Sequence, residues 1–189
     1  MKILIGAGGN AKDVLSFLFS NDIYFVDDFK TGEFMDYPII GTIDEFIERY
    51  RKMDVKPEVY NCIGSEGDNL IRNRIYEKLK GAGVKTSPLL LSPQYISRNV
   101  TIGENVLIGL NAQIHHDCRI GESTVISPGA IILGGVTIKV NAFIGAGAII
   151  RQHLTIGEGA VIGMGSIVLH DIEPNSVYVG NPARLLRKG

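Results

Sequence analysis

Isoleucine recurs at every sixth position through the second half of the chain. Twelve isoleucines run from Ile96 to Ile162 at this spacing, and Val168 continues the series. A period of six fits neither an α-helix, with a period of 3.6 residues, nor a flat strand, with a period of two. It is typical of a β-solenoid, in which three short strands form a triangular coil of about eighteen residues and each isoleucine points into the prism.

A second regular position lies four residues after each isoleucine. It is usually small or aliphatic, as at Val106, Ala112, Cys118, Ala130, Val136, Ala142, Ala148 and Ala160. Glycine or another small turn-forming residue commonly follows the isoleucine. We therefore predict that this second position also faces the interior of the prism.

The first half of the chain follows a different pattern, in which buried strands alternate with amphipathic helices. Strands are predicted at residues 2–6, 23–28, 58–64 and 84–87, and helices at 10–20, 42–52 and 68–83. Thr42 is a good helix N-cap, and glycine closes the last helix. This alternation predicts a small parallel sheet with helices on both faces. We expect two domains, an α/β domain over residues 1–88 and a solenoid over 89–189 with a tail after Ile172.

Composition excludes several classes of function. The 189 residues carry a formal net charge of −1, so nothing suggests nucleic acid or an anionic membrane as a partner. No segment approaches the ~20 apolar residues that span a bilayer, and the first residues break into glycines too early for a secretory signal. Two cysteines make no disulfide framework. We expect a cytoplasmic protein.

A glycine-rich turn joins the first strand to the first helix. Residues 6–11 read GAGGNA, and Asp27 and Asp28 end the next strand, which loosely matches a dinucleotide-binding fingerprint. A tight strand–helix turn is the alternative reading. Because residues 1–88 are too few for both halves of a Rossmann fold, we predict a half-Rossmann-like domain that holds a nucleoside diphosphate. The loop after the third strand, with Ile63 and Gly64, lies along the same edge.

One repeat carries the candidate catalytic pair, His116 and Asp117. Position 116 follows an inward isoleucine by two residues, so its side chain is expected near a corner of the prism. Imidazole suits proton transfer near neutral pH, and a neighbouring carboxylate can fix its tautomer. His115 is the alternative exposed histidine. Cys118 is a conceivable nucleophile, but its inward position favours core packing.

Four motifs in order extend this pattern to nearly the whole chain: GAGGNAKDV, VDDFK, IGSEGDNLIRNRIYEKL and HHDCRIG. Together they resemble the hexapeptide-repeat sugar acetyltransferases, above all the bacterial UDP-4-amino-sugar N-acetyltransferases of the bacillosamine type. The sialic-acid O-acetyltransferases are similar in architecture. The resemblance implies a left-handed parallel β-helix, a homotrimer, and acetyl-CoA as co-substrate in a groove between prisms, with no metal. It implies the 4-amino group of a UDP-linked 4-amino-4,6-dideoxy sugar as acceptor.

The resemblance also assigns roles to individual residues. The base and its orienting group are His116 and Asp117, with direct attack of the amine on the thioester. The nucleotide sugar is expected at Gly8, Gly9, Asn10, Asp27, Asp28, Ile63 and Gly64. The acyl donor is expected at Gly134, Ala146, Met164 and Arg184. Asn10 stands where many relatives have histidine, and Val125 stands where many have a second histidine near the thioester.

Gly134 lies eighteen residues after His116, one coil further along the same corner. Its backbone N–H is expected to meet the developing oxyanion, although a glycine that merely permits the turn is the alternative. His153 and His170 are expected to be solvated.

Three other functions compete with N-acetylation. O-acetylation of a sialic-acid-like sugar uses a similar site, and the sequence does not separate an amine from a hydroxyl acceptor. A metal-dependent lyase would need three histidines that converge on zinc, and the four histidines lack such spacing. A noncatalytic nucleotide-sugar-binding scaffold would keep the fold without turnover.

Overall fold

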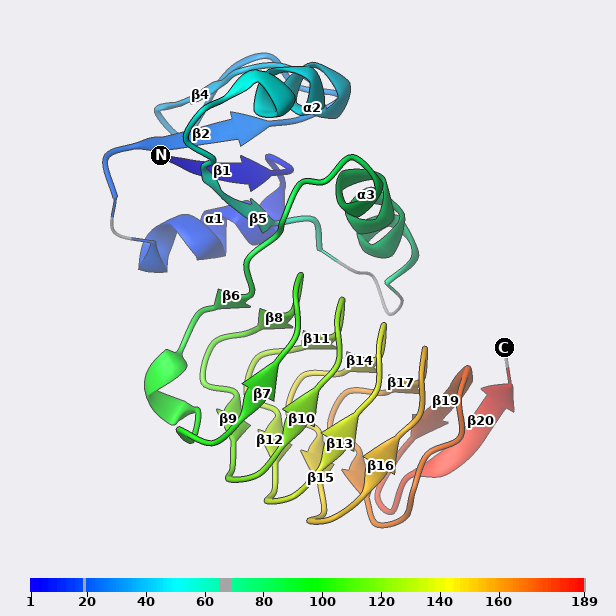
Figure 1. Cartoon of the computed structure of the whole chain (residues 1–189). Coiled ribbons are helices and arrows are strands. Elements are labelled where there is room, and N and C mark those ends of the chain that lie inside the picture. Colours follow the sequence, from blue (N-terminus) through cyan, green and yellow to red (C-terminus); the bar gives the residue numbers. More distant parts are fainter. Residues whose placement is uncertain (19, 65–68, 189) are drawn as a thin grey trace. The chain divides into compact units, whose positions relative to one another are not determined.

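The computed structural model describes residues 1–18, 20–64 and 69–188, and the chain forms two compact units (Figure 1). Of the described residues, 1–64 and 70–87 make up the first unit, while Asn69 and residues 88–188 make up the second. The predicted domains, residues 1–88 and 89–189, stay a prediction. Within the described ranges, no helix is long and apolar enough to cross a membrane.

The first unit is built on a five-stranded sheet. Its strands are β1 (Lys2–Ile5), β2 (Ile23–Val26), β3 (Gly32–Phe34), β4 (Tyr37–Ile39) and β5 (Glu58–Asn61), in the order β3-β4-β2-β1-β5. The pairs β1–β2 and β1–β5 are parallel, as the alternating pattern predicts, and β4, which was not predicted, also pairs in parallel with β2.

The hairpin of β3 and β4 was not anticipated from the sequence. Its two strands pair antiparallel, and the two turn residues, Met35 and Asp36, have φ of 50° and 67°. Such two-residue turns usually carry Asn-Gly or Asp-Gly, because both positions need positive φ. Met35 and Asp36 are not typical residues of such a turn, so the sequence does not predict the hairpin.

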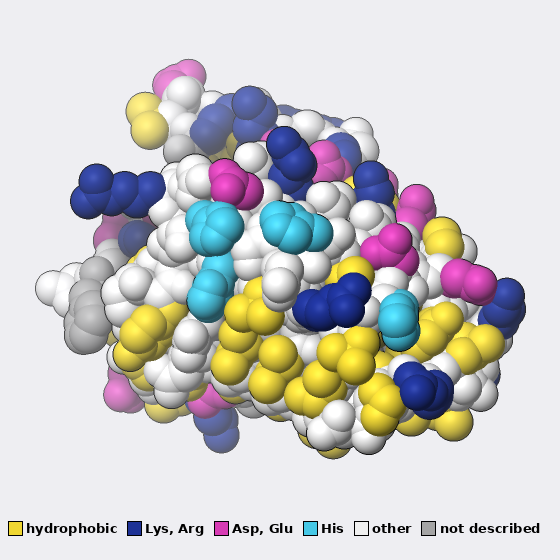
Figure 2. All heavy atoms as spheres, turned by 90° about the horizontal axis from the view of Figure 1, so that it is seen from below, with side chains coloured by type: hydrophobic (Ala, Val, Ile, Leu, Met, Phe, Trp, Pro, Cys, Tyr) yellow, Lys and Arg dark blue, Asp and Glu magenta, His cyan; other side chains and the backbone are white. Residues whose placement is uncertain are grey.

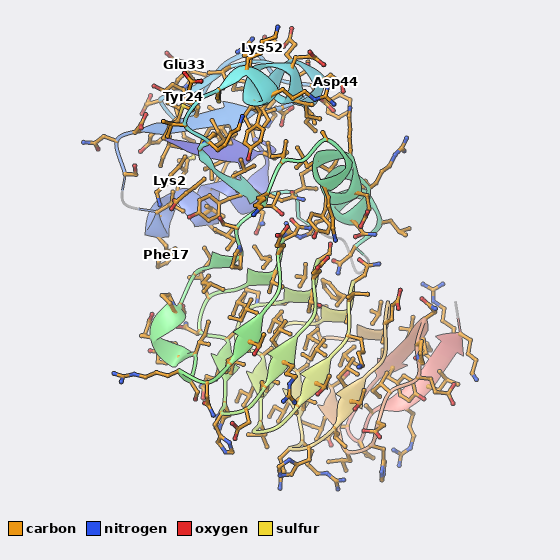
Figure 3. All side chains as sticks on the ribbon, in the orientation of Figure 1. Lys2, Phe17, Tyr24, Glu33, Asp44 and Lys52 are labelled. Carbon is orange, nitrogen blue, oxygen red and sulfur yellow. The ribbon has the colours of Figure 1, made fainter. Side chains whose placement is uncertain are left out.

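Three helices cover the sheet: α1 (Gly9–Phe17), α2 (Ile43–Lys52) and α3 (Leu70–Gly81). Apolar residues of α2 and α3 join Ile3, Ile5 and Val59 in one buried cluster, while α1 lies on the other side of the sheet (Figure 1). The predicted N-cap is confirmed, because Thr42 and Glu45 form a reciprocal capping box. The charged residues Asp44 and Lys52 of α2 point away from the sheet (Figure 3).

The strand predicted at residues 84–87 is wrong. Val84 donates its N–H to Leu79 O at 2.9 Å, next to Gly83 at φ 78°, so the segment first closes α3. Beyond that closure, a single backbone bond from Ser87 to Val59 O reaches β5. The β-branched residues of this segment resemble those of a strand, but the N–H of Val84 closes the C-terminus of the helix instead.

The second unit is a three-sided parallel β-helix. Its first and last regular segments are β6 (Leu89–Leu90) with the 3-10 turn η1 (Pro93–Tyr95), and β19 (Ser176–Val179) with β20 (Arg184–Lys188). Between them lie two-residue strands: β7 (Thr101–Ile102), β8 (Leu107–Ile108), β9 (Gln113–Ile114), β10 (Arg119–Ile120), β11 (Val125–Ile126), β12 (Ile131–Ile132), β13 (Thr137–Ile138), β14 (Phe143–Ile144), β15 (Ile149–Ile150), β16 (Thr155–Ile156), β17 (Val161–Ile162) and β18 (Ile167–Val168).

Each strand pairs in parallel with the strand one coil away. Ile120 pairs with Ile138, which is eighteen positions later (138 − 120), and the same step recurs in all three sheets. The isoleucines from Ile108 to Ile162 are at most 3% exposed, and the small residues of the second position are buried beside them. The predicted period and the inward direction of both positions are confirmed.

From Asn105 to Gly165, the third residue after each inward isoleucine lies in the left-handed region. The occupants are Asn105, Asn111, Asp117, Ser123, Gly129, Gly135, Asn141, Gly147, His153, Gly159 and Gly165. Glycine, asparagine and aspartate tolerate positive φ at little cost, which explains their recurrence at this position.

The residues after Ile172 are more ordered than the predicted tail. β19 extends the sheet of β17 in parallel, and β20 folds back antiparallel to β19. Both strands leave the six-residue register, so the repeat pattern gives no sign of them. They cover the last coil, whose open edge would otherwise expose unpaired backbone groups.

Candidate functional site

The corner that follows β9 presents the predicted catalytic pair. His116 Nδ1 lies 2.8 Å from Asp117 Oδ2, and both side chains are 64% exposed. Asp117 occupies the left-handed corner position at φ 60°, which turns its carboxylate back toward the preceding ring. A carboxylate accepts at Nδ1, so the Nδ1–H tautomer is favoured and Nε2 is left with a lone pair for a proton.

Asn99 completes this arrangement from the coil before. Its side-chain amide donates to Asp117 Oδ1, so the carboxylate is held on both oxygens. Asn99 precedes Asp117 by eighteen residues and therefore occupies the same corner position. The eighteen-residue register could have identified it, but the search for titratable groups passed over an asparagine.

The next coil places two glycines, Gly134 and Gly135, against the imidazole. A Cβ added to Gly134 would lie 2.6 Å from both Nε2 and Cε1 of His116, closer than atoms can pack. The ring therefore occupies the space that a side chain at position 134 would fill. The N–H of Gly134 donates to no described residue, while its carbonyl accepts from His153 N at 3.0 Å.

The other histidines are distributed along the same corner. His115 is half-buried beside the catalytic candidate, and it lines a shallow hollow of about 230 Å³ with residues of η1 and β9. His153 is exposed and lies one coil beyond Gly134. His170 is also exposed and lies three coils beyond His116. Figure 2 shows the histidine side chains gathered on one face of the molecule.

Cys118 lies inside the prism, as the register predicts. It is 1% exposed, and its thiol donates to Leu133 O at 3.2 Å. Burial raises the pKa of the Cys118 thiol above its ordinary value, which disfavours the thiolate. The geometry therefore supports a packing role rather than nucleophilic attack.

The residues expected to bind the acyl donor fall on two corners of the prism. Gly134 shares the corner of His116, whereas Ala146 and the 81% exposed Met164 share the corner that precedes β9, β12, β15 and β18. Arg184 lines a hollow of about 200 Å³ with His170 at the end of the prism. A single prism does not bring these groups together.

The sheet between these two corners has an apolar outer face. The outward positions of β12, β15 and β18 are Ile131, Ile149 and Ile167, all partly exposed. In contrast, the equivalent positions of β10, β13 and β16 are Arg119, Thr137 and Thr155. Figure 2 shows hydrophobic side chains beside the histidines on this face.

In the first unit, the glycine turn precedes α1 and leaves open space beside the N-terminus of that helix. Gly8 is the N-cap without a side-chain cap, and a Cβ on Gly8 or Gly9 would meet nothing within 4 Å. The first N–H groups of α1 are therefore accessible, and the helix dipole favours an anion there.

The loop after β5 lies beside this turn. Asn10 Nδ2 donates to Cys62 O at 3.2 Å, and a Cβ on Gly64 would lie 3.6 Å from Asn10 Cβ. Gly6 has no room for a side chain, because a Cβ there would meet Ile63 Cγ1 at 2.8 Å. The structure thus brings Gly8, Gly9, Asn10, Ile63 and Gly64 to one edge, as predicted. Residues 65–68 of the loop lie outside the described residues.

A buried arginine holds this loop in place. Arg72 of α3 donates to Asn61 O at 2.6 Å and to Ile63 O at 3.1 Å. Burial lowers the pKa of Arg72 to about 10 and raises the pKa of Cys62 to about 12. Cys62 is therefore an inert core thiol, as predicted, and Arg72 supports the backbone of the candidate site.

The paired acids have structural partners. Asp27 Oδ2 accepts from Ala7 N at 2.7 Å, and its Oδ1 accepts from the backbone of Phe29 and Lys30. Asp28 Oδ1 accepts from Ile43 N at 2.8 Å, at the start of α2. Asp27 thus ties the glycine turn to the end of β2, and Oδ2 of Asp28 makes no hydrogen bond to a described residue.

Lys30 is a residue that sequence reasoning missed. Its ammonium donates to Ala7 O within the glycine turn and lies 5.0 Å from the centre of the Phe34 ring. A positive charge is therefore fixed beside the start of α1. Lys30 ends the VDDFK motif, but the motif alone gives it no role, because its position depends on the turn that Asp27 stabilises.

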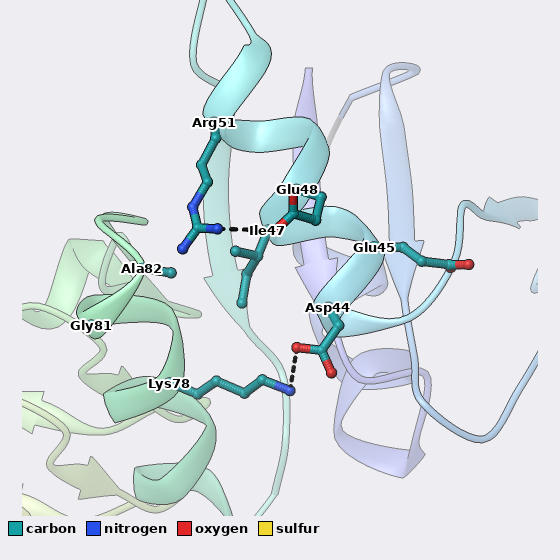
Figure 4. A pocket seen from close by; sticks show the side chains of 8 residues that line it. All are labelled: Asp44, Glu45, Ile47, Glu48, Arg51, Lys78, Gly81 and Ala82. Carbon is teal, nitrogen blue, oxygen red and sulfur yellow. Dashed lines mark hydrogen bonds and ion pairs between the residues drawn. The ribbon is translucent and has the colours of Figure 1, made fainter.

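The first unit has a hollow of about 510 Å³ between α2 and α3 (Figure 4). Its charges are already paired: Lys78 with Asp44 at 2.7 Å, and Arg51 with Glu48 at 2.9 Å. We assign it no ligand. Among the described residues, no three histidine, cysteine or acidic side chains converge as a metal site would require.

Comparison with known proteins matches both units. Residues 3–79 match the PglD N-terminal domain, residues 99–134 the bacterial transferase hexapeptide (six repeats), and residues 135–170 the hexapeptide repeat of succinyl-transferase. No curated protein sequence matches the chain.

Solved structures resemble the chain over nearly its full length. The acetyltransferase domain of PglB from Neisseria gonorrhoeae FA1090 is 28% identical, with 98% of each chain covered and a TM-score of 0.79, and has also been solved with acetyl coenzyme A. A variant of perosamine N-acetyltransferase from Caulobacter crescentus, with CoA and GDP-perosamine, is 25% identical, with 98% and 96% covered and a TM-score of 0.80. WeeI from Acinetobacter baumannii AYE is 28% identical, with 98% and 99% covered and a TM-score of 0.74.

These matches confirm two sequence-based predictions. The resemblance to hexapeptide-repeat sugar acetyltransferases holds for both units, and the fold is an α/β domain followed by a left-handed parallel β-helix. The assignments of individual site residues stay predictions.

Proposed function

This chain is an acetyltransferase that joins a PglD N-terminal domain to a hexapeptide-repeat β-helix, and we propose that it acetylates the amino group of a nucleotide-linked amino sugar. Acetyl-CoA as co-substrate, predicted from the sequence, agrees with the neighbours solved with acetyl coenzyme A or CoA. The observation that carries the proposal is the exposed His116–Asp117 pair at a corner of the prism.

The acceptor we propose is a UDP-linked 4-amino-4,6-dideoxy sugar. The open N-terminus of α1 suits its diphosphate, with Lys30 as a fixed cation at the turn. Asp28 and the backbone of Ile63 and Gly64 are left for the nucleoside. The perosamine enzyme among the neighbours was solved with a GDP sugar, so the identity of the base is the finer part of this proposal.

His116 is the proposed general base. The sugar amine attacks the acetyl carbonyl carbon, a C–N bond forms, and the carbonyl electron pair moves to oxygen. Nε2 of His116 takes the proton that the nitrogen sheds, and Asp117 stabilises the imidazolium that results. Collapse of the intermediate breaks the C–S bond, and His116 returns the proton to the CoA thiolate. The unpartnered N–H of Gly134 is placed to donate to the oxyanion.

The acceptor is tested by a panel of UDP- and GDP-linked amino and hydroxy sugars with acetyl-CoA. Thiol release is followed in a coupled assay, and the product is examined by NMR for the acetylated atom. We expect the fastest release with a UDP-4-amino sugar and acetyl on nitrogen. Acetyl on oxygen would support the O-acetyltransferase alternative, and ligand binding without thiol release would support the scaffold.

A charge at the start of α1 tests the diphosphate site. Gly9→Asp is expected to weaken binding of the UDP sugar at least about tenfold, because a carboxylate would occupy the region of the phosphate and repel it. The free space at Gly9 and the helix dipole should leave the melting temperature unchanged or higher. Calorimetric titration measures the affinity. Gly9→Asn is the uncharged control and should bind nearly as the native chain, and equal affinity of the two variants would exclude a phosphate at this turn.

We propose that the chain is a homotrimer. The apolar face of Ile131, Ile149 and Ile167 separates the corner of His116 from the corner of Ala146 and Met164. In a closed ring of three prisms, one face of each copy packs on its neighbour, and the two corners of adjacent copies meet. Such packing would cover the apolar face and complete an acyl-donor groove that one prism lacks.

Ile149→Glu is expected to disrupt this assembly, because it places a charge at the centre of the apolar face. Light scattering after size exclusion should give three chains for the native protein and one for the variant, with loss of activity. Thr137→Glu, at the matching position of the polar sheet, is the control and should stay trimeric. A native protein that is monomeric at micromolar concentration would contradict the proposed assembly.

A further inference from the structure

We propose that His153 is a second imidazole of the reaction centre, which donates a hydrogen bond to the thioester carbonyl oxygen of the acyl donor as that oxygen acquires negative charge. The inference rests on the proposed function and adds to it a residue that the six-residue pattern marks only as a solvated turn. Three observations support it: the position of the ring, the conformation of the backbone and the absence of a structural hydrogen bond.

The ring of His153 lies against Gly135, the neighbour of the Gly134 that the ring of His116 lies against. A Cβ on Gly135 would meet Nδ1 of His153 and lie 2.9 Å from its Cε1, just as a Cβ on Gly134 would meet the ring of His116. Backbone bonds fix the three coils at this corner, from Gly135 N to His116 O at 2.8 Å and from His153 N to Gly134 O at 3.0 Å.

This stacking determines what lies between the two rings. Coils repeat at about 4.8 Å, so the backbones of His116 and His153 are roughly 10 Å apart, and both rings lie over the intervening coil. At the corner that coil contributes Gly134 and Gly135, and the two rings fill the space that side chains there would take. An acetyl thioester that reaches this corner from outside therefore meets both imidazoles.

The backbone of His153 is in the left-handed region, at φ 61°. The other non-glycine residues at this position of the corners are asparagine, aspartate or serine, and glycine fills the rest. Left-handed backbone costs a residue with a Cβ about 1 kcal/mol relative to glycine. Asparagine and aspartate offset part of this by local hydrogen bonds, but the ring of His153 makes none with any described residue.

The chemistry of the transfer supplies a use for this imidazole. Attack on the thioester moves an electron pair onto the carbonyl oxygen, and donors already aimed at that oxygen lower the barrier. His116 accepts a proton at this stage, so it is not available to stabilise the oxyanion. Gly134 N–H is one donor at the corner, and a ring N–H of His153 makes a second.

His153→Gly tests the assignment, since it removes the ring and relieves the backbone. Turnover of acetyl-CoA with the UDP amino sugar is expected to fall about 10²-fold, with little change in KM for either substrate. The melting temperature should stay equal or rise, which a structural role would not produce. His153→Asn keeps an N–H donor and tolerates positive φ, so it should recover part of the lost turnover.

Asn175→Gly is the matched control. Asn175 also has positive φ, at 50°, and its side chain lies over a glycine, Gly159, on a different corner. It should keep native turnover. A His153→Gly variant with native kcat, or with a raised KM for acetyl-CoA alone, would overturn the oxyanion contact while the proposed function stands. A native protein that releases no thiol with any sugar of the panel would overturn both.

Discussion

Replacing His116 with alanine is expected to lower turnover by about 10²- to 10⁴-fold, which is the range that a positioned general base contributes. The exposed ring lies at a corner of the β-helix and makes one side-chain hydrogen bond, to Asp117, so its loss should not disturb the fold. Steady-state thiol release measures the effect. The affinity for the UDP sugar, whose proposed contacts are in the first unit, should change by less than about twofold.

His115→Ala is the matched control, because it removes the neighbouring imidazole from the same repeat. It should keep most of the native turnover, whereas His115 as the true base would reverse the two results. Asp117→Asn should also lower turnover, since it removes the charge that stabilises the imidazolium and one of the two acceptor oxygens that His116 and Asn99 use. Native activity of His116→Ala would exclude His116 as the base.

Gly134→Ala is expected to lower turnover about 10²-fold although it adds a single methyl group. That Cβ would lie 2.6 Å from Nε2 and Cε1 of His116, so the ring must leave its place. A displacement of about 1 Å at a reacting group can cost this much rate, because proton transfer requires hydrogen-bond distance. The substitution keeps the backbone N–H, so it tests the position of the ring and not the oxyanion contact.

A double-mutant cycle separates this effect from general strain in the coil. In the His116→Ala background the added methyl group meets no ring, so Gly134→Ala should lower the residual rate little further. Additive losses in the two backgrounds would mean that the glycine acts independently of His116, for instance through the turn alone.

Much of the β-helix could be predicted because its inward positions repeat at a fixed spacing along the sequence. One inward isoleucine per six residues specifies the strands, their faces and the coil to which each belongs, so the position of His116 under Gly134 follows from a difference of eighteen. The same arithmetic places Asn99 and His153 at this corner. They were missed because asparagine does not titrate, and because a histidine in a turn resembles any solvated residue.

The first unit was less predictable, because local sequence does not record partners distant along the chain. The Met35-Asp36 turn lacks the usual glycine, and residues 84–87 have strand-like side chains but complete a helix cap. Asp27 and Asp28 were read as ligand groups, yet their carboxylates accept backbone N–H groups of the turns around them. Only coordinates show which polar groups a fold has already used.

A crystal structure of the protein with CoA and its UDP amino sugar tests the central claim most directly. We predict that the sugar nitrogen and the CoA sulfur meet at the corner formed by His116 and Gly134, with the nitrogen about 3 Å from Nε2. The pantetheine arm should run between two prisms. A sulfur atom bound away from this corner, or a sugar nitrogen out of reach of Nε2, would contradict the account.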